Sequence, residues 1–385
     1  MSVQSSVGRL SSLFDRRLGS LLLVLLFISG CASRPGPEVL RTVEPVAESS
    51  HVTVYTATTR ARAPHEAIEF TTERAHSLTY ARFSVSIPAN HEPSRIEWPS
   101  GTPDPSTSFA VVDQTILDKQ AFMEEVRMAN RAAGGTGVGI FVHGFNHNFP
   151  ETLFRLAQMS ADMGLEAPQI AFSWPSQANL RGYLDDKNSA TYSRDYLAEV
   201  IGELAARDDI GEITIVGHSM GAWLVMEALR QLRLQGQDRV IARLRVVLAA
   251  PDIDVDVFRR QLEVIGPLPS PLMVLVSPED RALLISQWIA ASRPRIGTLD
   301  VRDPGVQAAA QLANVQFVDI TALADAGGAG HDRYIALATT IPQHETAPGT
   351  GPLRDVRQAG AFVLDAVGAI ISAPFGLAGQ ALAGE

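Results

Sequence analysis

The stretch Glu212-Ile213-Thr214-Ile215-Val216-Gly217-His218-Ser219-Met220-Gly221-Ala222 decides the fold of this chain. Its first part is rich in β-branched residues and predicts a buried strand, and helical spacing runs from Ala222 to Leu234. A G-x-S-x-G pattern joins the two. The pattern is weak alone, but a strand–turn–helix context is where a sharp turn holds a nucleophilic serine at a strand end. The sequence therefore predicts Ser219 as a nucleophile. The alternative is a glycine-rich turn that binds nothing or binds phosphate, although the lysine of a P-loop is missing.

Outward from this segment, short apolar runs alternate with stretches of helical spacing. The runs are 138–142, 169–174, 212–216, 244–249, 272–276 and 315–320, and the helical stretches are 150–163, 185–206 and 222–234. Such alternation indicates an α/β fold whose mostly parallel sheet has helices on both faces. Chemistry in these sheets lies at the carboxyl ends of the strands. His143, Trp174, Ser219, Asp252 and Asp280 all fall there.

Before this alternating region, the pattern is different. The ranges 51–57 and 80–87 alternate like strands, 91–114 is rich in proline and predicts a loop, and 116–133 has helical spacing.

A nucleophilic serine needs a histidine base, which this fold places last, after the acid. Of nine histidines, His331 fits this order, and Gly327-Gly328-Ala329-Gly330 before it predicts a loop able to return over Ser219. His344 also lies downstream, but in a proline- and glycine-rich stretch, so we favour His331.

The acid must orient the histidine and stabilise its protonated form. Asp280 follows the strand after which this fold usually places the acid, and we favour it. Asp252 follows the preceding strand and is the alternative acid; it otherwise belongs with Asp254 and Asp256 to a structural or rim cluster.

The oxyanion that forms during acyl transfer needs backbone donors. We expect the N–H of Met220 and that of Phe145, with Asn146 as a further side-chain donor. Trp174 and Tyr183 are candidates for the wall of an acyl pocket, with packing in the core as an equal alternative for Trp174.

Composition narrows the classes of partner. The chain has 385 residues, a net charge of -10 and no long basic run, which argues against nucleic acid as a partner. Hydrophobic residues make up 46%, enough for a large core. The single cysteine, Cys31, allows neither an internal disulfide nor a cysteine-rich zinc site, and the predicted chemistry needs no metal or cofactor.

The N-terminal residues are typical of an export signal. Arginines at 9, 16 and 17 precede the apolar run 18–28, which is shorter than the about 20 residues of a membrane-spanning helix. Ile28-Ser29-Gly30-Cys31 resembles the bacterial lipobox, so we expect cleavage before Cys31 and acylation of its sulfur, as with palmitate. Ala32 in the next position favours the outer membrane. The chain is then an exported envelope lipoprotein that faces the periplasm.

The domain organisation follows from these signals. We expect a signal peptide at 1–30, a tether at 31–50 and the α/β-hydrolase domain at 51–340. A linker and an apolar C-terminal helix occupy 341–385, and the nearly uncharged 359–384 either packs on the body or rests on the membrane.

Taken together, these motifs resemble a bacterial α/β-hydrolase family of unknown function, DUF900, over roughly residues 52–335. The segments that carry the resemblance are 55–60, 141–146, 172–176, 182–185, 217–221, 249–254, 280–283 and 330–331. The resemblance implies the α/β-hydrolase fold and a Ser219–Asp280–His331 triad, but no substrate.

The sequence thus predicts a serine hydrolase of the carboxylesterase or lipase type. It would cleave an ester or related acyl bond, in a small molecule or a lipid, through an acyl-enzyme. Acyl transfer by the same triad, and a non-catalytic envelope lipoprotein that uses the fold for binding, are the alternatives.

Overall fold

The computed structural model describes residues 34–64, 68–289, 293–325 and 327–337. The chain divides into two units, Met1–Gly36 and Pro37–Glu385, and every element below belongs to the second. Residues 1–33, with the predicted signal peptide and Cys31, and residues 338–385, with His344 and the apolar stretch 359–384, lie outside the described residues.

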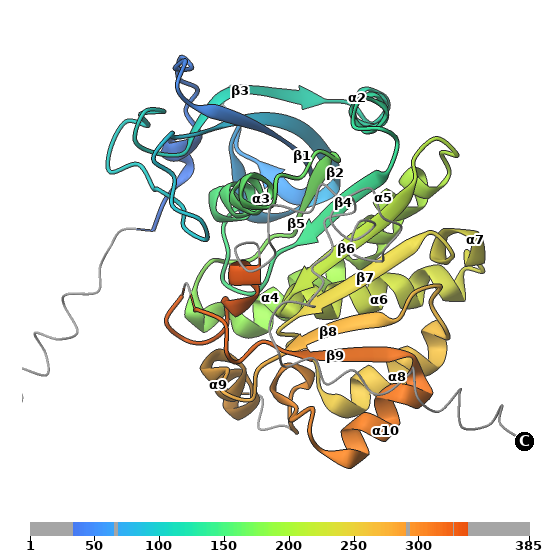
Figure 1. Ribbon diagram of the computed structural model, residues 1–385. Helices are drawn as coiled ribbons and strands as arrows, with labels where there is room; N and C mark the ends of the chain where they lie inside the picture. The colour runs from blue at the N-terminus through green and yellow to red at the C-terminus, as the bar shows by residue number, and fades with distance from the viewer. Residues whose placement is uncertain (1–33, 65–67, 290–292, 326, 338–385) are drawn as a thin grey trace, which may run out of the picture. The chain divides into compact units, whose positions relative to one another are not determined.

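The described residues form a nine-stranded sheet in the order β3-β2-β1-β5-β4-β6-β7-β8-β9 (Figure 1). The strands are β1 Ser50–Arg62, β2 Phe70–Ile87, β3 Ala110–Leu117, β4 Gly137–Val142, β5 Gln169–Ser173, β6 Glu212–His218, β7 Leu244–Ala249, β8 Leu272–Val276 and β9 Val315–Asp319. In this spatial order, every neighbouring pair from β1 to β9 is parallel. β2 pairs antiparallel with both of its neighbours, β1 and β3. The mostly parallel α/β sheet is therefore confirmed.

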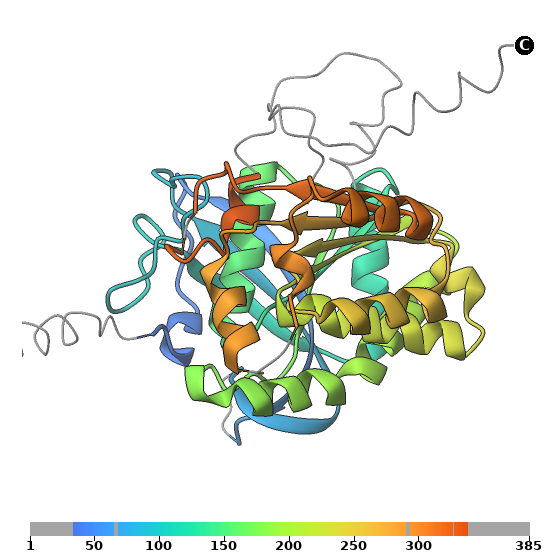
Figure 2. The ribbon, with the colours of Figure 1, turned by 90° about the horizontal axis from the view of Figure 1, so that it is seen from below.

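The helices lie along this sheet, as the view in Figure 2 shows. The α-helices are α2 Lys119–Ala132, α3 Phe149–Met163, α4 Tyr183–Tyr192, α5 Arg194–Ala205, α6 Met220–Leu234, α7 Asp238–Ile241, α8 Val255–Ile265, α9 Arg281–Ile289 and α10 Pro304–Ala313. The 3-10 turns are η1 Pro37–Leu40, η2 Leu180–Gly182, η3 Ile296–Thr298 and η4 Arg333–Ala336.

Two apolar clusters fill the two faces of the sheet. Successive residues of a strand alternate between them: Ile215 and Val246 belong to the cluster of α2, α5, α6 and α8, whereas Val216 and Val247 belong to that of η1, α3 and η4. Because side chains alternate across a pleated strand, each central strand is apolar on both faces. This explains the continuous apolar runs in the sequence.

Three expectations about the elements were wrong. The loop expected over 91–114 does not extend beyond residue 109, because β3 begins at Ala110. The helix expected from 116 begins at Lys119, because residues 110–117 pair with β2 as β3 and Asp118 caps the helix. The helix expected over 185–206 is two helices, which meet at Ser193. The sequence analysis also assigned no helix to the segments that form α7, α8, α9 and α10.

The folded body includes residues within the range interpreted as a tether. Val39 and Leu40 of η1 are buried in the α3 cluster, and the Val43 N–H donates to the Val111 carbonyl of β3. In the described part of the chain, no helix is both long enough and apolar enough to cross a membrane.

Candidate active site

Ser219 occupies the turn between β6 and α6, and its backbone is strained. Its φ of 53° and ψ of −119° lie in a region that L-residues rarely adopt. Hydrogen bonds to the neighbouring strand end fix this conformation. The Ser219 N–H donates to the Ala249 carbonyl at 2.9 Å, and the Ser219 carbonyl accepts from the N–H groups of Ala222 at 3.1 Å and Asp252 at 3.2 Å.

The two glycines of the turn leave no room for a side chain. A Cβ on Gly217 would lie 2.8 Å from Ala222 Cα, and one on Gly221 would lie 2.3 Å from the His143 carbonyl oxygen. Both contacts are far below van der Waals distance and involve backbone atoms. The G-x-S-x-G spacing is thus set by the close approach of α6 to β6 and to the end of β4.

His331 and Asp280 form a hydrogen-bonded pair at the same end of the sheet. His331 Nδ1 lies 2.7 Å from Asp280 Oδ2, and the Asp280 carboxylate is fully buried. The other carboxylate oxygen accepts from the Leu283 N–H at 3.0 Å, in the first turn of α9. The Arg281 N–H donates to the Ala329 carbonyl, which ties the glycine-rich loop to the start of α9.

The surroundings of His331 favour its protonated form. Burial alone would lower the pKa of His331, but the hydrogen bond to Asp280 and that carboxylate's charge outweigh it, so the pKa is raised above 6.5. Among the described residues, no hydrogen bond joins Ser219 Oγ to His331. Catalytic hydrogen bonds are often long before substrate binds, so this separation is compatible with a triad.

His218 is a contact of His331 that the sequence analysis did not anticipate. Its ring centroid lies 4.7 Å from that of His331 and 4.5 Å from that of Tyr334. Burial, followed by the charges of His331 and His147, holds the pKa of His218 well below its usual range. A neutral imidazole in the turn therefore packs beside the titrating one. No pattern in the sequence indicates this contact, because it forms only when the loop that carries His331 folds against the turn.

The loop after β4 passes directly over Ser219. A Cβ on Gly144 would lie 3.0 Å from Ser219 Cβ and 2.9 Å from His218 Nδ1. In the described part of the chain, neither the Phe145 N–H nor the Met220 N–H has a hydrogen-bond partner. Two backbone donors thus remain available, one on each segment that meets at Ser219.

Comparison with known proteins identifies the family of this chain. The model of a family described as "Alpha/beta hydrolase of unknown function (DUF900)" matches residues 118–346, more than half of the chain. The chain belongs to this family.

Two further similarities are more distant. A "Transmembrane and coiled-coil domain-containing protein STS1" of Oryza sativa subsp. japonica is 27% identical over 178 residues, which is 45% of this chain and 25% of that protein. The chain therefore spans about a quarter of that relative's length. The "Crystal structure of ESTFA (FE-lacking apo form)" is 12% identical, with 78% of this chain and 80% of that chain covered; its TM-score of 0.28 supports no conclusion.

In this DUF900 member, Asp252 does not contact His331. Its carboxylate accepts from the Tyr183 hydroxyl at 2.8 Å and the Ser286 hydroxyl at 2.8 Å, and Arg295 Nε lies 3.1 Å away. All these side chains are buried or nearly so. The two carboxylates that the sequence offered as the acid thus have separate partners.

Both candidate pocket aromatics, Trp174 and Tyr183, contact the segment that follows β4. Trp174 is fully buried, its ring stacks on His143 at 4.7 Å, and its Nε1 donates to the His143 carbonyl at 2.8 Å. Tyr183 meets Phe145 edge to face at 5.4 Å. Asn146 has a φ of 61° and uses its backbone N–H as a donor to Asp186.

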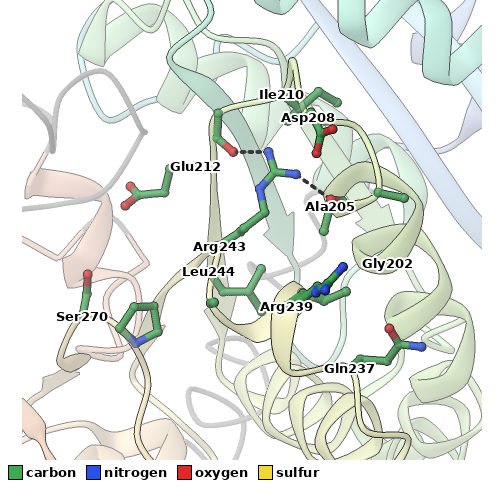
Figure 3. A pocket seen from close by; sticks show the side chains of 15 residues that line it. Gly202, Ala205, Asp208, Ile210, Glu212, Gln237, Arg239, Arg243, Leu244 and Ser270 are labelled. Carbon is green, nitrogen blue, oxygen red and sulfur yellow. Dashed lines mark hydrogen bonds between the residues drawn. The ribbon is translucent and has the colours of Figure 1, made fainter.

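A groove of about 820 Å³ lies elsewhere, at the amino ends of β6 and β7 (Figure 3). Arg243 lines it, and its guanidinium donates to the carbonyls of Ala205, Arg207 and Gly211. Because parallel sheets carry their chemistry at the carboxyl ends, this groove is at the wrong end for Ser219.

Proposed function

We propose that this protein is a serine hydrolase that cleaves ester or related acyl bonds through an acyl-enzyme. The observation that carries the proposal is the 2.7 Å hydrogen bond between His331 and a fully buried Asp280, at the end of the sheet where Ser219 lies in a strained turn. Membership of an α/β-hydrolase family supports the same reading, although the family has no assigned function.

In the proposed mechanism, His331 Nε2 takes the proton of Ser219 as the hydroxyl oxygen attacks the carbonyl carbon. Asp280 holds Nδ1–H and stabilises the imidazolium that forms. The Phe145 and Met220 N–H groups donate to the oxyanion of the tetrahedral intermediate. His331 then protonates the leaving alcohol, and water, deprotonated by His331, releases the acid from Ser219.

The proposed substrate is an acyl ester, either a small molecule or a lipid. Exposed apolar side chains on the elements that carry Tyr183 and follow Asp280 support an apolar acyl group. They are Leu180 of η2, Leu184 of α4, and Leu284, Ile285 and Trp288 of α9. We also propose that an acylated Cys31 attaches the protein to a membrane. Cys31 lies outside the described residues, so this part of the proposal rests on the sequence.

A fluorophosphonate probe tests the nucleophile directly, because it reacts covalently with an activated serine. We expect the folded wild type to be labelled and to lose esterase activity, and Ser219→Ala not to be labelled. Ser160→Ala is a matched control: Ser160 is also buried, but its hydroxyl bonds to the Leu156 carbonyl within α3. Absence of labelling in folded wild-type protein would overturn the proposal.

A panel of esters with varied acyl length then defines the substrate, and added alcohols show whether the acyl group passes to water or to an acceptor. If the acylated alcohol forms in preference to the free acid, the activity is acyl transfer and not hydrolysis.

A further inference from the structure

Two buried groups of opposite charge lie beside the loop that passes over Ser219, and the mechanism above uses neither. Arg60, at the end of β1, is 1% exposed, and Asp186, in α4, is 0% exposed. Burying a charge is costly unless hydrogen bonds and opposite charges compensate it. The hydrogen-bond partners of Arg60 and Asp186 therefore show which segments these two side chains hold in place.

Arg60 spans from the sheet to the loop. Its Nε donates to the Ser173 hydroxyl at 2.9 Å, and its Nη1 donates to the Ser176 carbonyl at 3.2 Å, both just at or after the end of β5. Its Nη2 donates to the His147 carbonyl at 2.8 Å. A planar guanidinium fixes these directions relative to one another. The loop is thereby held at a set distance from the strand ends.

Asp186 reaches the same loop from α4. Its carboxylate accepts from the Asn146 N–H at 3.2 Å, the Gln177 N–H at 2.6 Å and the Ser176 hydroxyl at 2.5 Å. Asn146 has a φ of 61°, in the left-handed region that asparagine adopts more readily than most residues with a side chain. The hydrogen bond to Asp186 therefore holds the loop at its left-handed residue.

The two charged groups act on adjacent residues of the loop and share a partner. Arg60 binds the carbonyl of His147, Asp186 binds the N–H of Asn146, and Ser176 contacts both through its carbonyl and its hydroxyl. The residue immediately before this clamped pair is Phe145. Its position relative to Ser219 thus depends on the two charges.

We propose that Arg60 and Asp186 are positioning residues, which fix the loop so that the Phe145 N–H points at the oxyanion formed on attack by Ser219. This inference rests on the proposed function. It places no group of Arg60 or Asp186 in contact with substrate; both act through the loop backbone.

The most direct perturbation is Asp186→Asn, which keeps the shape but replaces one acceptor oxygen by an NH2 group. Because three donors converge on the carboxylate, the NH2 group must face at least one of them. In one orientation the NH2 group faces the Asn146 N–H, and in the other that N–H donates to a neutral amide oxygen, so in both cases its hydrogen bond to a charged carboxylate is lost. We expect kcat for an ester to fall by roughly 10- to 100-fold with little change in KM.

A comparison of oxygen and sulfur esters separates positioning from general damage. A thionoester places sulfur, a larger atom and a weaker acceptor, where the oxyanion forms. The wild type should therefore hydrolyse an ester far faster than its thionoester. In Asp186→Asn, we expect the ester rate to fall while the thionoester rate changes little, so that the ratio of the two falls by roughly 10-fold or more.

Asp162→Asn is a matched control for the loss of a buried carboxylate. Asp162 lies in α3, is 6% exposed and accepts from Gln158, His91 and Ser94. We expect it to leave the ratio unchanged. Ser176→Ala is a milder second variant, because it removes one donor to Asp186 and should lower the ratio partway.

The outcomes distinguish this inference from the proposed function. A wild type that hydrolyses no ester and reacts with no fluorophosphonate refutes both. An active wild type whose ester-to-thionoester ratio is the same in Asp186→Asn and Ser176→Ala refutes the positioning role alone. If Asp186→Asn does not fold, an unchanged ratio in Ser176→Ala decides against the inference, and a lowered ratio supports it.

Discussion

Replacing each candidate acid by asparagine should give opposite results at Asp280 and Asp252. In Asp280→Asn, the amide oxygen must stay on the Leu283 N–H, which donates to Oδ1 at 3.0 Å in the wild type. The amide NH2 then faces His331 Nδ1, which lay 2.7 Å from Oδ2, and donates to it. The proton of the neutral imidazole moves to Nε2, which can no longer accept the proton of Ser219.

The expected loss in kcat for Asp280→Asn is therefore about 10³- to 10⁴-fold. At about 1.4 kcal/mol per tenfold, this is roughly 4 to 5.5 kcal/mol of transition-state stabilisation. The unfolding free energy should fall by less, about 1.5 to 3 kcal/mol, the usual contribution of one hydrogen bond to a charged group. The cap of α9 is retained, since asparagine is a good N-cap residue.

Asp252→Asn should instead act mainly on stability. It breaks a buried ion pair with Arg295, whose Nε lies 3.1 Å from Asp252 Oδ1, and this should cost about 3 to 5 kcal/mol. Urea denaturation and ester hydrolysis by the folded fraction measure the two effects separately. Our reasoning is refuted if Asp252→Asn abolishes turnover with unchanged stability while Asp280→Asn stays within about threefold of wild-type activity, because Asp252 would then be the acid.

Three further predictions follow, two from the geometry of the site and one from the sequence. The pKa of His331 is raised above 6.5, and a general base must be neutral to accept a proton. The value of kcat/KM should therefore rise with pH, and the midpoint of this rise should lie above pH 6.5. A midpoint below pH 6.5 in a pH–rate profile would contradict the assignment of His331 as the base. Gly221→Ala would place a Cβ 2.3 Å from the His143 carbonyl, so urea denaturation should show a loss of about 1 to 3 kcal/mol, and wild-type stability would argue against the close approach. Cys31→Ser should move the protein from the membrane fraction to the soluble fraction. If the variant stays in the membrane fraction, another segment anchors the protein, and residues 359–384 are the candidate.

The sequence predicted those parts of the fold and site that depend on local pattern. The alternation of apolar runs and helices identified the parallel strands, and the order serine, acid, histidine selected His331, which the structure pairs with Asp280. In the sequence, Asp280 and Asp252 each follow a predicted strand. Position along the chain therefore favoured Asp280 as the acid but left Asp252 as an alternative. The structure separates them through partners such as Tyr183 and Ser286, which lie far from Asp252 in the sequence.

Long-range contacts were beyond the reach of pattern. Arg60 and His147 are 87 residues apart, and only the fold brings them together, so no spacing rule could have joined them. The sequence analysis placed residues 110–114 in a predicted loop and residues 116–117 in a predicted helix, whereas pairing with β2 makes 110–117 a strand. Arg60 lies three residues beyond the predicted strand 51–57, and its burial appears only in the structure.

The Asp252 cluster stabilises the backbone under the nucleophile. Ser219 has a φ of 53°, and Ala250, which follows β7, has a φ of 45°; two strained residues thus lie at the ends of adjacent strands. Each such conformation costs about 1 to 3 kcal/mol and persists only where the surroundings over-determine it. The Ser219 N–H donates to the Ala249 carbonyl, and the Asp252 N–H donates to the Ser219 carbonyl, so the two turns stabilise each other. Because Arg295 and two hydroxyl groups hold the Asp252 side chain, its backbone N–H stays where the Ser219 carbonyl needs it. The Asp252 side chain thus supports the backbone next to Ser219 from the end of the adjacent strand. Because the backbone hydrogen bond itself survives in Asp252→Asn, the loss of this support should appear mainly in the stability of the protein.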